Sequence, residues 1–220
     1  ADISDMSQVY KVFESHHSRF GSNPVIVINA AGVQGPIGPT WTQDPVEWET
    51  AIRINLTGSY FVTKAAIEAM LLVGYGTIIH FSGGGAAYAR PNFSAYAASK
   101  TGVLRLVENV AEELTLAGYP RITINAIAPG AVKTRMTEKI LQAGNRAGPK
   151  AIREAEQVRS TGGTSPEQIF ALVDFLCDLE RSTGLSGRLI HVRDSYIEFV
   201  NKFNFDFPEE AGKLRRVPLT

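Results

Sequence analysis

The chain has few of the features that mark disulfide-rich, secreted or membrane-spanning proteins. Cys177 is the only cysteine among 220 residues, so no internal disulfide can form, and we expect a reducing compartment, the cytoplasm. It falls within the apolar pattern of residues 169–179, which favours a buried structural thiol over a nucleophile. No apolar run is long enough to cross a bilayer, and no basic-then-apolar secretion signal opens the sequence.

The sequence also has no excess of charge of either sign. The 22 basic side chains balance 22 acidic ones, so the formal net charge is zero, which argues against nucleic acid or a membrane surface as a partner. The four histidines have no metal-ligand spacing, and no metal site is expected: His16, His17, His80 and His191. The length and the 44% hydrophobic content are typical of a single globular domain.

What the sequence does contain is an alternation of strand and helix patterns. Continuous β-branched runs at 24–30, 76–81 and 121–128 predict strands buried on both faces, as in a parallel sheet, and 189–192 reads as a last strand. Helical periodicity marks the intervening segments, namely residues 6–20 (capped by Asp2 or Ser4 and ended by Gly21), 45–72, 95–117, 135–142 and 166–179. This order predicts an α/β fold, a doubly wound parallel sheet of the Rossmann-like kind.

The organising motif lies at the head of the helix predicted for 95–117. Tyr96 and Lys100 are four residues apart, so both side chains lie on one helix face. A neighbouring cation stabilises a phenolate and lowers the pKa of a tyrosine. A phenol tuned in this way is a general acid/base for a carbonyl or alcohol oxygen. Alone, however, this pair is more typical of a plain surface helix.

Other short motifs accompany the pair in a fixed order. They are Asn29-Ala30-Ala31-Gly32 after the first strand, Asn55 in the following helix, Ser82 after the second strand, and Pro129-Gly130-Ala131-Val132-Lys133-Thr134 after the third. The set resembles the short-chain dehydrogenase/reductase family over roughly residues 1–192. The resemblance implies an NAD(P)-dependent oxidoreductase that interconverts an alcohol and a ketone or aldehyde.

The resemblance also implies a role for each motif. Tyr96 exchanges the proton, Lys100 lowers its pKa and binds the nicotinamide ribose, Ser82 orients the substrate oxygen, and Asn55 anchors a water relay. The residues expected to border NAD or NADP are Asp2, Ile3, Asn29, Ala30, Ala31, Gly32, Tyr96, Lys100, Pro129, Gly130, Val132 and Thr134. A purely structural role is the alternative for three of these residues. Asp2 and Thr134 would then be helix caps, and Asn29 would belong to a plain strand-ending turn.

The sequence departs from the family pattern in two places. The catalytic serine usually lies thirteen residues before the tyrosine, which is Gly83 here, whereas Ser82 lies fourteen before it. We prefer Ser82, displaced by a bulge in the glycines that follow; the alternative is a site without the serine. The family's Thr-Gly-x-x-x-Gly-x-Gly loop is also absent, so we expect either an omitted N-terminal part, which we favour, or a true fragment with an exposed sheet edge.

The remaining expectations concern the surroundings of the site. Residues 143–164 have the composition of a mobile substrate lid. The tail, 193–220, carries Tyr196, Phe199, Phe203, Phe205 and Phe207 and packs on the domain, beside the pocket or on a neighbouring subunit. The helices around 58–72 and 95–117 form a homodimer or homotetramer interface in the family. A different class of function stays open, a non-catalytic scaffold that keeps the fold but binds no dinucleotide.

Overall fold

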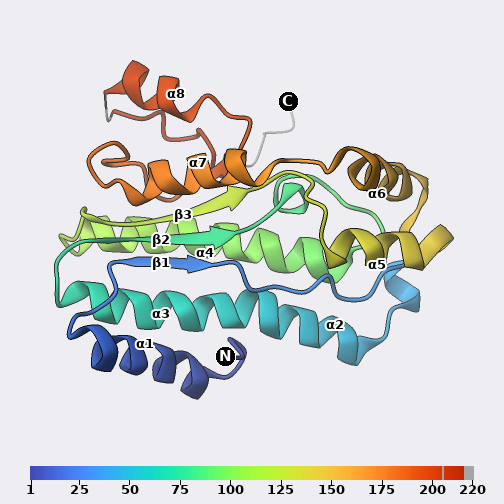
Figure 1. Cartoon of the computed structure of the whole chain (residues 1–220), viewed down its shortest axis with the longest axis horizontal. Coiled ribbons are helices and arrows are strands. Elements are labelled where there is room, and N and C mark those ends of the chain that lie inside the picture. Colours follow the sequence, from blue (N-terminus) through green and yellow to red (C-terminus); the bar gives the residue numbers. More distant parts are fainter. Residues whose placement is uncertain (205, 216–220) are drawn as a thin grey trace.

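The computed structural model describes residues 1–204 and 206–215 of the chain. In this part the strands β1 (Ile26–Asn29), β2 (Gly76–Phe81), β3 (Ile122–Ala128) and β4 (Leu189–His191) form one sheet in the order β1-β2-β3-β4. Every neighbouring pair is parallel. The predicted parallel α/β sheet is therefore confirmed (Figure 1).

Helices cover both faces of this sheet. The helices are α1 (Met6–Phe20), α2 (Pro45–Ile52), α3 (Gly58–Leu71), α4 (Ser94–Leu116), α5 (Arg135–Ala143), α6 (Pro149–Thr161), α7 (Pro166–Cys177) and α8 (Tyr196–Phe203). On β2, Ile78 packs with α3 and α4, while the next residue, Ile79, packs with α7. Figure 1 shows α1 and α3 on one side of the sheet, α7 and α8 on the other, and α5 and α6 beyond the ends of the strands.

Burial differs sharply between the inner strands and the edge strand. All seven residues of β3 are buried, as the sequence predicts. In β1, by contrast, Ile26 and Ile28 are each 47% exposed, so the prediction of burial on both faces is wrong for this strand. Only Val27, on the opposite face, packs against α1 and α3. Among the described residues no strand pairs with the outer edge of β1.

Local signals explain several helix ends. The side chain of Asp5, and not of Asp2 or Ser4, accepts the Ser7 N–H at the start of α1, and Gly21 ends the helix with a φ of 67°. Between α2 and α3 the helix widens into a π-helical segment, Arg53–Thr57, which contains Asn55. Such bulges often accompany functional sites.

The two C-terminal expectations have different outcomes. Residues 143–164 form mainly a short 3-10 segment, Gly144–Ala147, and the helix α6, and their role as a mobile substrate lid stays a prediction. The tail packs on its own chain, because Tyr196 lies against Phe175 of α7, with 5.0 Å between ring centroids. Phe205 and residues 216–220 lie outside the described residues. No helix in the described part of the chain is long and apolar enough to cross a membrane.

Candidate active site

The parallel sheet brings most of the predicted site residues to one edge. β1 ends at Asn29, β2 at Phe81 and β3 at Ala128, so the motifs that follow these strands share the carboxyl edge of the sheet. Ligands bind at this edge in open α/β sheets. The helix α4 begins near this edge and supplies Tyr96 and Lys100 from its first two turns.

Lys100 is held in place by the strand beside it. Its side chain is buried, and Nζ donates a hydrogen bond of 2.7 Å to the Phe81 carbonyl oxygen. Burial lowers the pKa of Lys100 from 10.5 to about 8. An ammonium group has three donors, and no described residue accepts from the other two, so they are available to a ligand.

Asn55 ties the turn after β1 to α4. Its Oδ1 accepts the Val33 N–H at 2.8 Å, and its Nδ2 donates to the Val33 carbonyl oxygen and to Ser99 Oγ. A Cβ atom on Gly32 would lie 3.2 Å from Asn55 Oδ1 and 3.4 Å from Lys100 Nζ. The small residue therefore brings the turn close to both polar groups, and the specific partners expected for Asn55 are confirmed.

His80 completes this polar region, and the sequence analysis did not single it out. Its ring is fully buried between Asn29 Nδ2, 3.1 Å from Nδ1, and Thr63 Oγ1, 2.8 Å from Nε2. The single hydroxyl hydrogen of Thr63 is directed to the Ser59 carbonyl oxygen, so Nε2 carries the proton and Nδ1 accepts from Asn29. Burial, with a smaller effect of Lys100, lowers the pKa of His80 to about 3, and the ring is neutral.

A chain of hydrogen bonds connects His80 to Asn55. Asn29 Nδ2 also donates to Ser59 Oγ, which in turn donates to the Asn55 carbonyl oxygen at 2.7 Å. Each donor hydrogen in this chain of hydrogen bonds has one acceptor, including the two on Asn29 Nδ2, so the hydrogens have a single arrangement. The only sequence signal for His80 is a polar residue inside an otherwise apolar strand.

Tyr96 lies close to Lys100, but its pKa is not lowered. Nζ of Lys100 is 5.9 Å from the centre of the Tyr96 ring. Burial raises the pKa of Tyr96, and Arg90 offsets this in part. The expectation that Lys100 lowers this pKa is therefore not met in this structure, because desolvation dominates and the ammonium group is directed at Phe81.

Ser82 and Gly83 differ in what they face. The Ser82 side chain is buried, and its Oγ makes a long 3.5 Å hydrogen bond to the Lys100 carbonyl oxygen. A Cβ atom on Gly83, however, would lie 3.1 Å from the Tyr96 hydroxyl oxygen. The structure therefore argues against Ser82 as the substrate-orienting residue and for the alternative, a glycine at this position.

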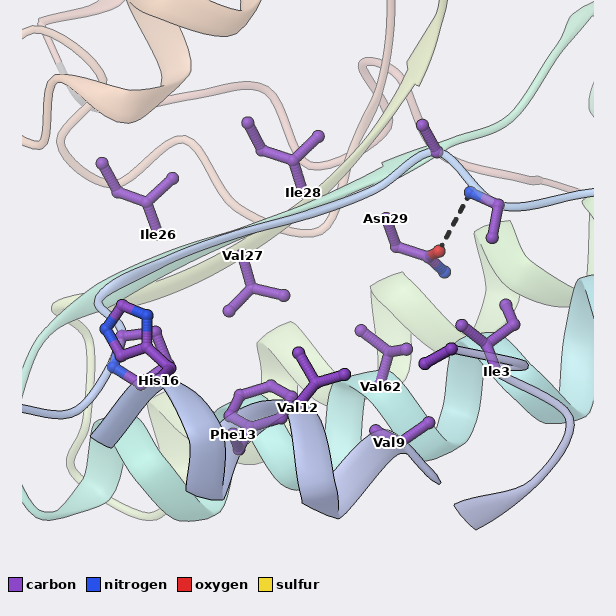
Figure 2. A pocket seen from close by; sticks show the side chains of 14 residues that line it. Ile3, Val9, Val12, Phe13, His16, Ile26, Val27, Ile28, Asn29 and Val62 are labelled. Carbon is purple, nitrogen blue, oxygen red and sulfur yellow. Dashed lines mark hydrogen bonds between the residues drawn. The ribbon is translucent and has the colours of Figure 1, made fainter. Parts of the chain in front are cut away.

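The first cofactor motifs lie along β1. A cavity of about 380 Å³ lies beside this strand, and its lining includes Ile3, Ala30 and Ala31. Figure 2 shows side chains that line it, among them Ile3 and Asn29. Asn29 Oδ1 accepts the Ala31 N–H, the dashed line in Figure 2, and so shapes the turn toward Gly32. Asp2 lies outside the lining of this cavity, and hydrogen bonds from the Ser4 backbone and side chain lower the pKa of its exposed carboxyl.

The motif after β3 turns back against the segment before α7. Pro129 leads into Gly130, whose φ is 74°, and a Cβ atom there would lie only 2.4 Å from Thr164 Oγ1. Val132 bridges to Gly163. Thr134 caps α5 by accepting the Met136 N–H at 3.2 Å, so the helix-cap role weighed for it is confirmed.

These residues fit the nicotinamide half of a dinucleotide. Lys100 keeps two N–H donors, and Thr164 Oγ1 is a buried polar atom beside Gly130 with no hydrogen-bond partner in the described structure. A ribose hydroxyl and a carboxamide are groups that such donors and acceptors bind. No described residues form a glycine-rich pyrophosphate loop, so this fit concerns the nicotinamide half alone.

A parallel sheet with these side chains at its carboxyl edge defines a Rossmann-type protein with an oxidoreductase-like site. The family model of short chain dehydrogenases matches residues 1–145, and the chain belongs to this family. It is 30% identical over 193 residues to a 3-oxoacyl-acyl-carrier-protein reductase of Thermotoga maritima, covering 87% of this chain and 73% of the relative. It is 35% identical over 179 residues to levodione reductase of Leifsonia aquatica, covering 80% of this chain and 65% of that protein.

Solved structures agree with the relatives. A crystal structure of levodione reductase superposes with a TM-score of 0.75 at 30% identity, over 90% of this chain and 76% of that one. A structure of NAD⁺-bound xylitol dehydrogenase superposes with a TM-score of 0.73 at 26% identity, over 87% of this chain and 75% of that one. Both the fold and membership of an oxidoreductase family are thus established for this chain.

Proposed function

We propose that the protein is an NAD(P)-dependent dehydrogenase/reductase that interconverts an alcohol and a ketone or aldehyde. The observation that carries this proposal is that Asn55 and Lys100 both lie beside the glycine turn at Gly32, with Lys100 Nζ 5.9 Å from the centre of the Tyr96 ring. The names of the relatives support a carbonyl or alcohol substrate. The single cysteine supports action in a reducing compartment, the cytoplasm.

Each residue has a distinct task in the proposed reaction. When bound, a nicotinamide supplies or accepts the hydride. Tyr96 donates its hydroxyl proton to the carbonyl oxygen during reduction and takes it back during oxidation. Lys100 binds the ribose through its two remaining N–H groups and stabilises the phenolate that Tyr96 becomes. Asn55 fixes the turn that borders the cofactor.

The test of this proposal is the Tyr96→Phe variant. Activity is followed through NADH and NADPH absorbance with a panel of ketones and aldehydes. We expect the variant to lose at least about a hundredfold in kcat/KM, the range of general acid catalysis. Enhancement of nicotinamide fluorescence on binding should change little, because the ring remains. Tyr119→Phe, at a 37% exposed tyrosine in the turn before β3, is the matched control. Turnover retained in Tyr96→Phe would contradict the mechanism.

A second candidate is a non-catalytic protein of the same fold. The glycine at position 83, beside the Tyr96 hydroxyl, favours it, because no serine side chain is there to orient a substrate oxygen. The same fluorescence titration separates the candidates. Saturable binding of NADH or NADPH with turnover supports the enzyme, whereas a folded protein that binds neither supports the scaffold.

We also propose self-association as a homodimer or homotetramer through α3 and α4. The end of each helix leaves a leucine 80% exposed, Leu72 after α3 and Leu116 in α4, and Tyr60 of α3 is 46% exposed. Exposed large apolar side chains are candidates for contact with another subunit. Light scattering coupled to size-exclusion chromatography measures the assembly directly, and a monomer at all concentrations would refute it.

A further inference from the structure

A second cavity is lined in part by Phe93, one turn of chain before the tyrosine–lysine pair. It has a volume of about 430 Å³ and lies between the loop 85–93 and the start of α6; we call it the α6 cavity. Phe93 is fully buried and lines this cavity, and it also belongs to the apolar cluster against which Tyr96 packs. A ligand in the α6 cavity therefore lies next to the proposed reaction centre.

Arg90 is a polar group of this cavity with unused hydrogen-bonding capacity. Its guanidinium carbon lies 4.7 Å from the centre of the Phe93 ring, and its Cδ lies over Gly85. Its Nε is buried and has no hydrogen-bond partner in the described structure. A guanidinium has five donors in a planar fork, so stacking fixes its orientation while its hydrogen-bonding capacity stays open.

The neighbouring charges indicate what Arg90 would bind. Its only ion-pair partner among the described residues is Glu154, and their atoms are 3.7 Å apart, beyond hydrogen-bond distance. Glu154 is 44% exposed, so the pair contributes little and the carboxylate can turn toward solvent. Lys150 adds a second cation at the rim. The cavity therefore carries one surplus positive charge beside apolar walls.

We propose that the α6 cavity binds the carboxylate of an oxo acid, or of the matching hydroxy acid, on the Arg90 guanidinium while the substrate oxygen lies at Tyr96. This assignment rests on the proposed function and narrows its substrate class. A bidentate arginine–carboxylate pair supplies two charge-assisted hydrogen bonds in place of the long contact with Glu154.

The experiment compares acids with their uncharged amides. Pyruvate, acetoacetate and levulinate, each with its primary amide, are titrated into the full chain by isothermal calorimetry, without cofactor and again with NADH or NADPH. We expect at least one acid to bind about tenfold or more tightly than its amide, as charge-assisted hydrogen bonds require. Arg90→Gln should abolish this difference, and Glu154→Gln should tighten acid binding severalfold without changing amide binding.

The matched control is Arg153→Gln, which removes the same charge from an exposed position on α6 outside the cavity lining. It should leave the preference for the acid unchanged. Equal binding of acids and amides, no binding of any acid, or a preference that persists in Arg90→Gln would overturn the proposal. If an acid binds through Arg90 but is not reduced with either cofactor, the proposed function fails while the assignment of the cavity stands.

Discussion

The two sides of Tyr96 differ in how fully their polar groups are satisfied. On the lysine side, Asn55, Asn29 and His80 are buried and each has specific hydrogen-bond partners. On the glycine side, Gly83 places no side chain beside the hydroxyl, and Arg90 leaves a buried nitrogen unpaired. A fully hydrogen-bonded network fixes the positions of its side chains, whereas unpaired donors and open space can accommodate a ligand. The lysine side therefore positions the proposed reaction, and the glycine side selects what reacts.

Removal of the Lys100 ammonium group on the lysine side should have the largest effect on activity. Lys100→Met takes away the ribose contact and the charge that stabilises the phenolate, and we expect kcat/KM to fall by at least about a hundredfold. The thermal midpoint should stay the same or rise, because a buried ammonium group with one hydrogen bond is costly in the folded state.

Lys139→Met, at an exposed position on α5, serves as the control and should change neither quantity. A large drop in thermal midpoint for Lys100→Met, with activity lost in proportion to unfolded protein, would make Lys100 structural instead.

The His80→Phe variant tests how much the hydrogen-bond network on the lysine side stabilises the fold. In His80→Phe the Asn29 amide and the Thr63 hydroxyl each lose a partner. We expect the free energy of unfolding at pH 7 to fall by about 2–4 kcal/mol, the cost of two unsatisfied buried groups. Urea denaturation followed by circular dichroism measures it, with His17→Gln, at an exposed histidine, as the control.

The same residue predicts a pH dependence. Burial places the pKa of His80 in the folded state at about 3, below its ordinary value of 6.5. The unfolded chain therefore binds the proton first, so stability is complete above pH 6.5 and falls progressively from there toward pH 3. In His80→Phe the part of this decline between about pH 5 and 6.5, above the range in which carboxylates titrate, should be smaller. An unchanged slope would show that His80 is not the titrating group.

A smaller effect on activity is expected from a change on the glycine side of Tyr96. Gly83→Ser places a hydroxyl beside Tyr96, and because φ at this position is not in the left-handed region, the backbone tolerates a side chain. We expect a gain of about three- to tenfold in kcat/KM. This corresponds to the net free energy of about one hydrogen bond, less than the full effect of a well-placed oxyanion donor. Gly83→Ala, which adds the same Cβ without the hydroxyl, should give no gain.

Ser82→Ala completes this comparison. Because the Ser82 hydroxyl faces the Lys100 carbonyl oxygen, we expect less than about a threefold change in kcat/KM, the cost of one weak hydrogen bond. A loss comparable to that of Tyr96→Phe would return the substrate-orienting role to Ser82.

The sequence by itself determined the parallel α/β fold, because β-branched runs and helical periodicity are local patterns that depend only on residue order. It also determined that Tyr96 and Lys100 share a helix face, and that an asparagine in mid-helix needs a partner. Only the tertiary structure decided which residue faces the Tyr96 hydroxyl, because Ser82 and Gly83 are neighbours in a loop whose path no local rule fixes.

Burial was likewise decided in three dimensions. The runs in β1 and β3 look alike in sequence, yet Ile26 and Ile28 are half-exposed while β3 is fully covered, because burial depends on what packs beside a strand. The raised pKa of Tyr96 has the same origin, since desolvation depends on neighbours far apart in the chain. His80 and Arg90 gain their importance from partners 51 and 64 residues away, which only folding brings together.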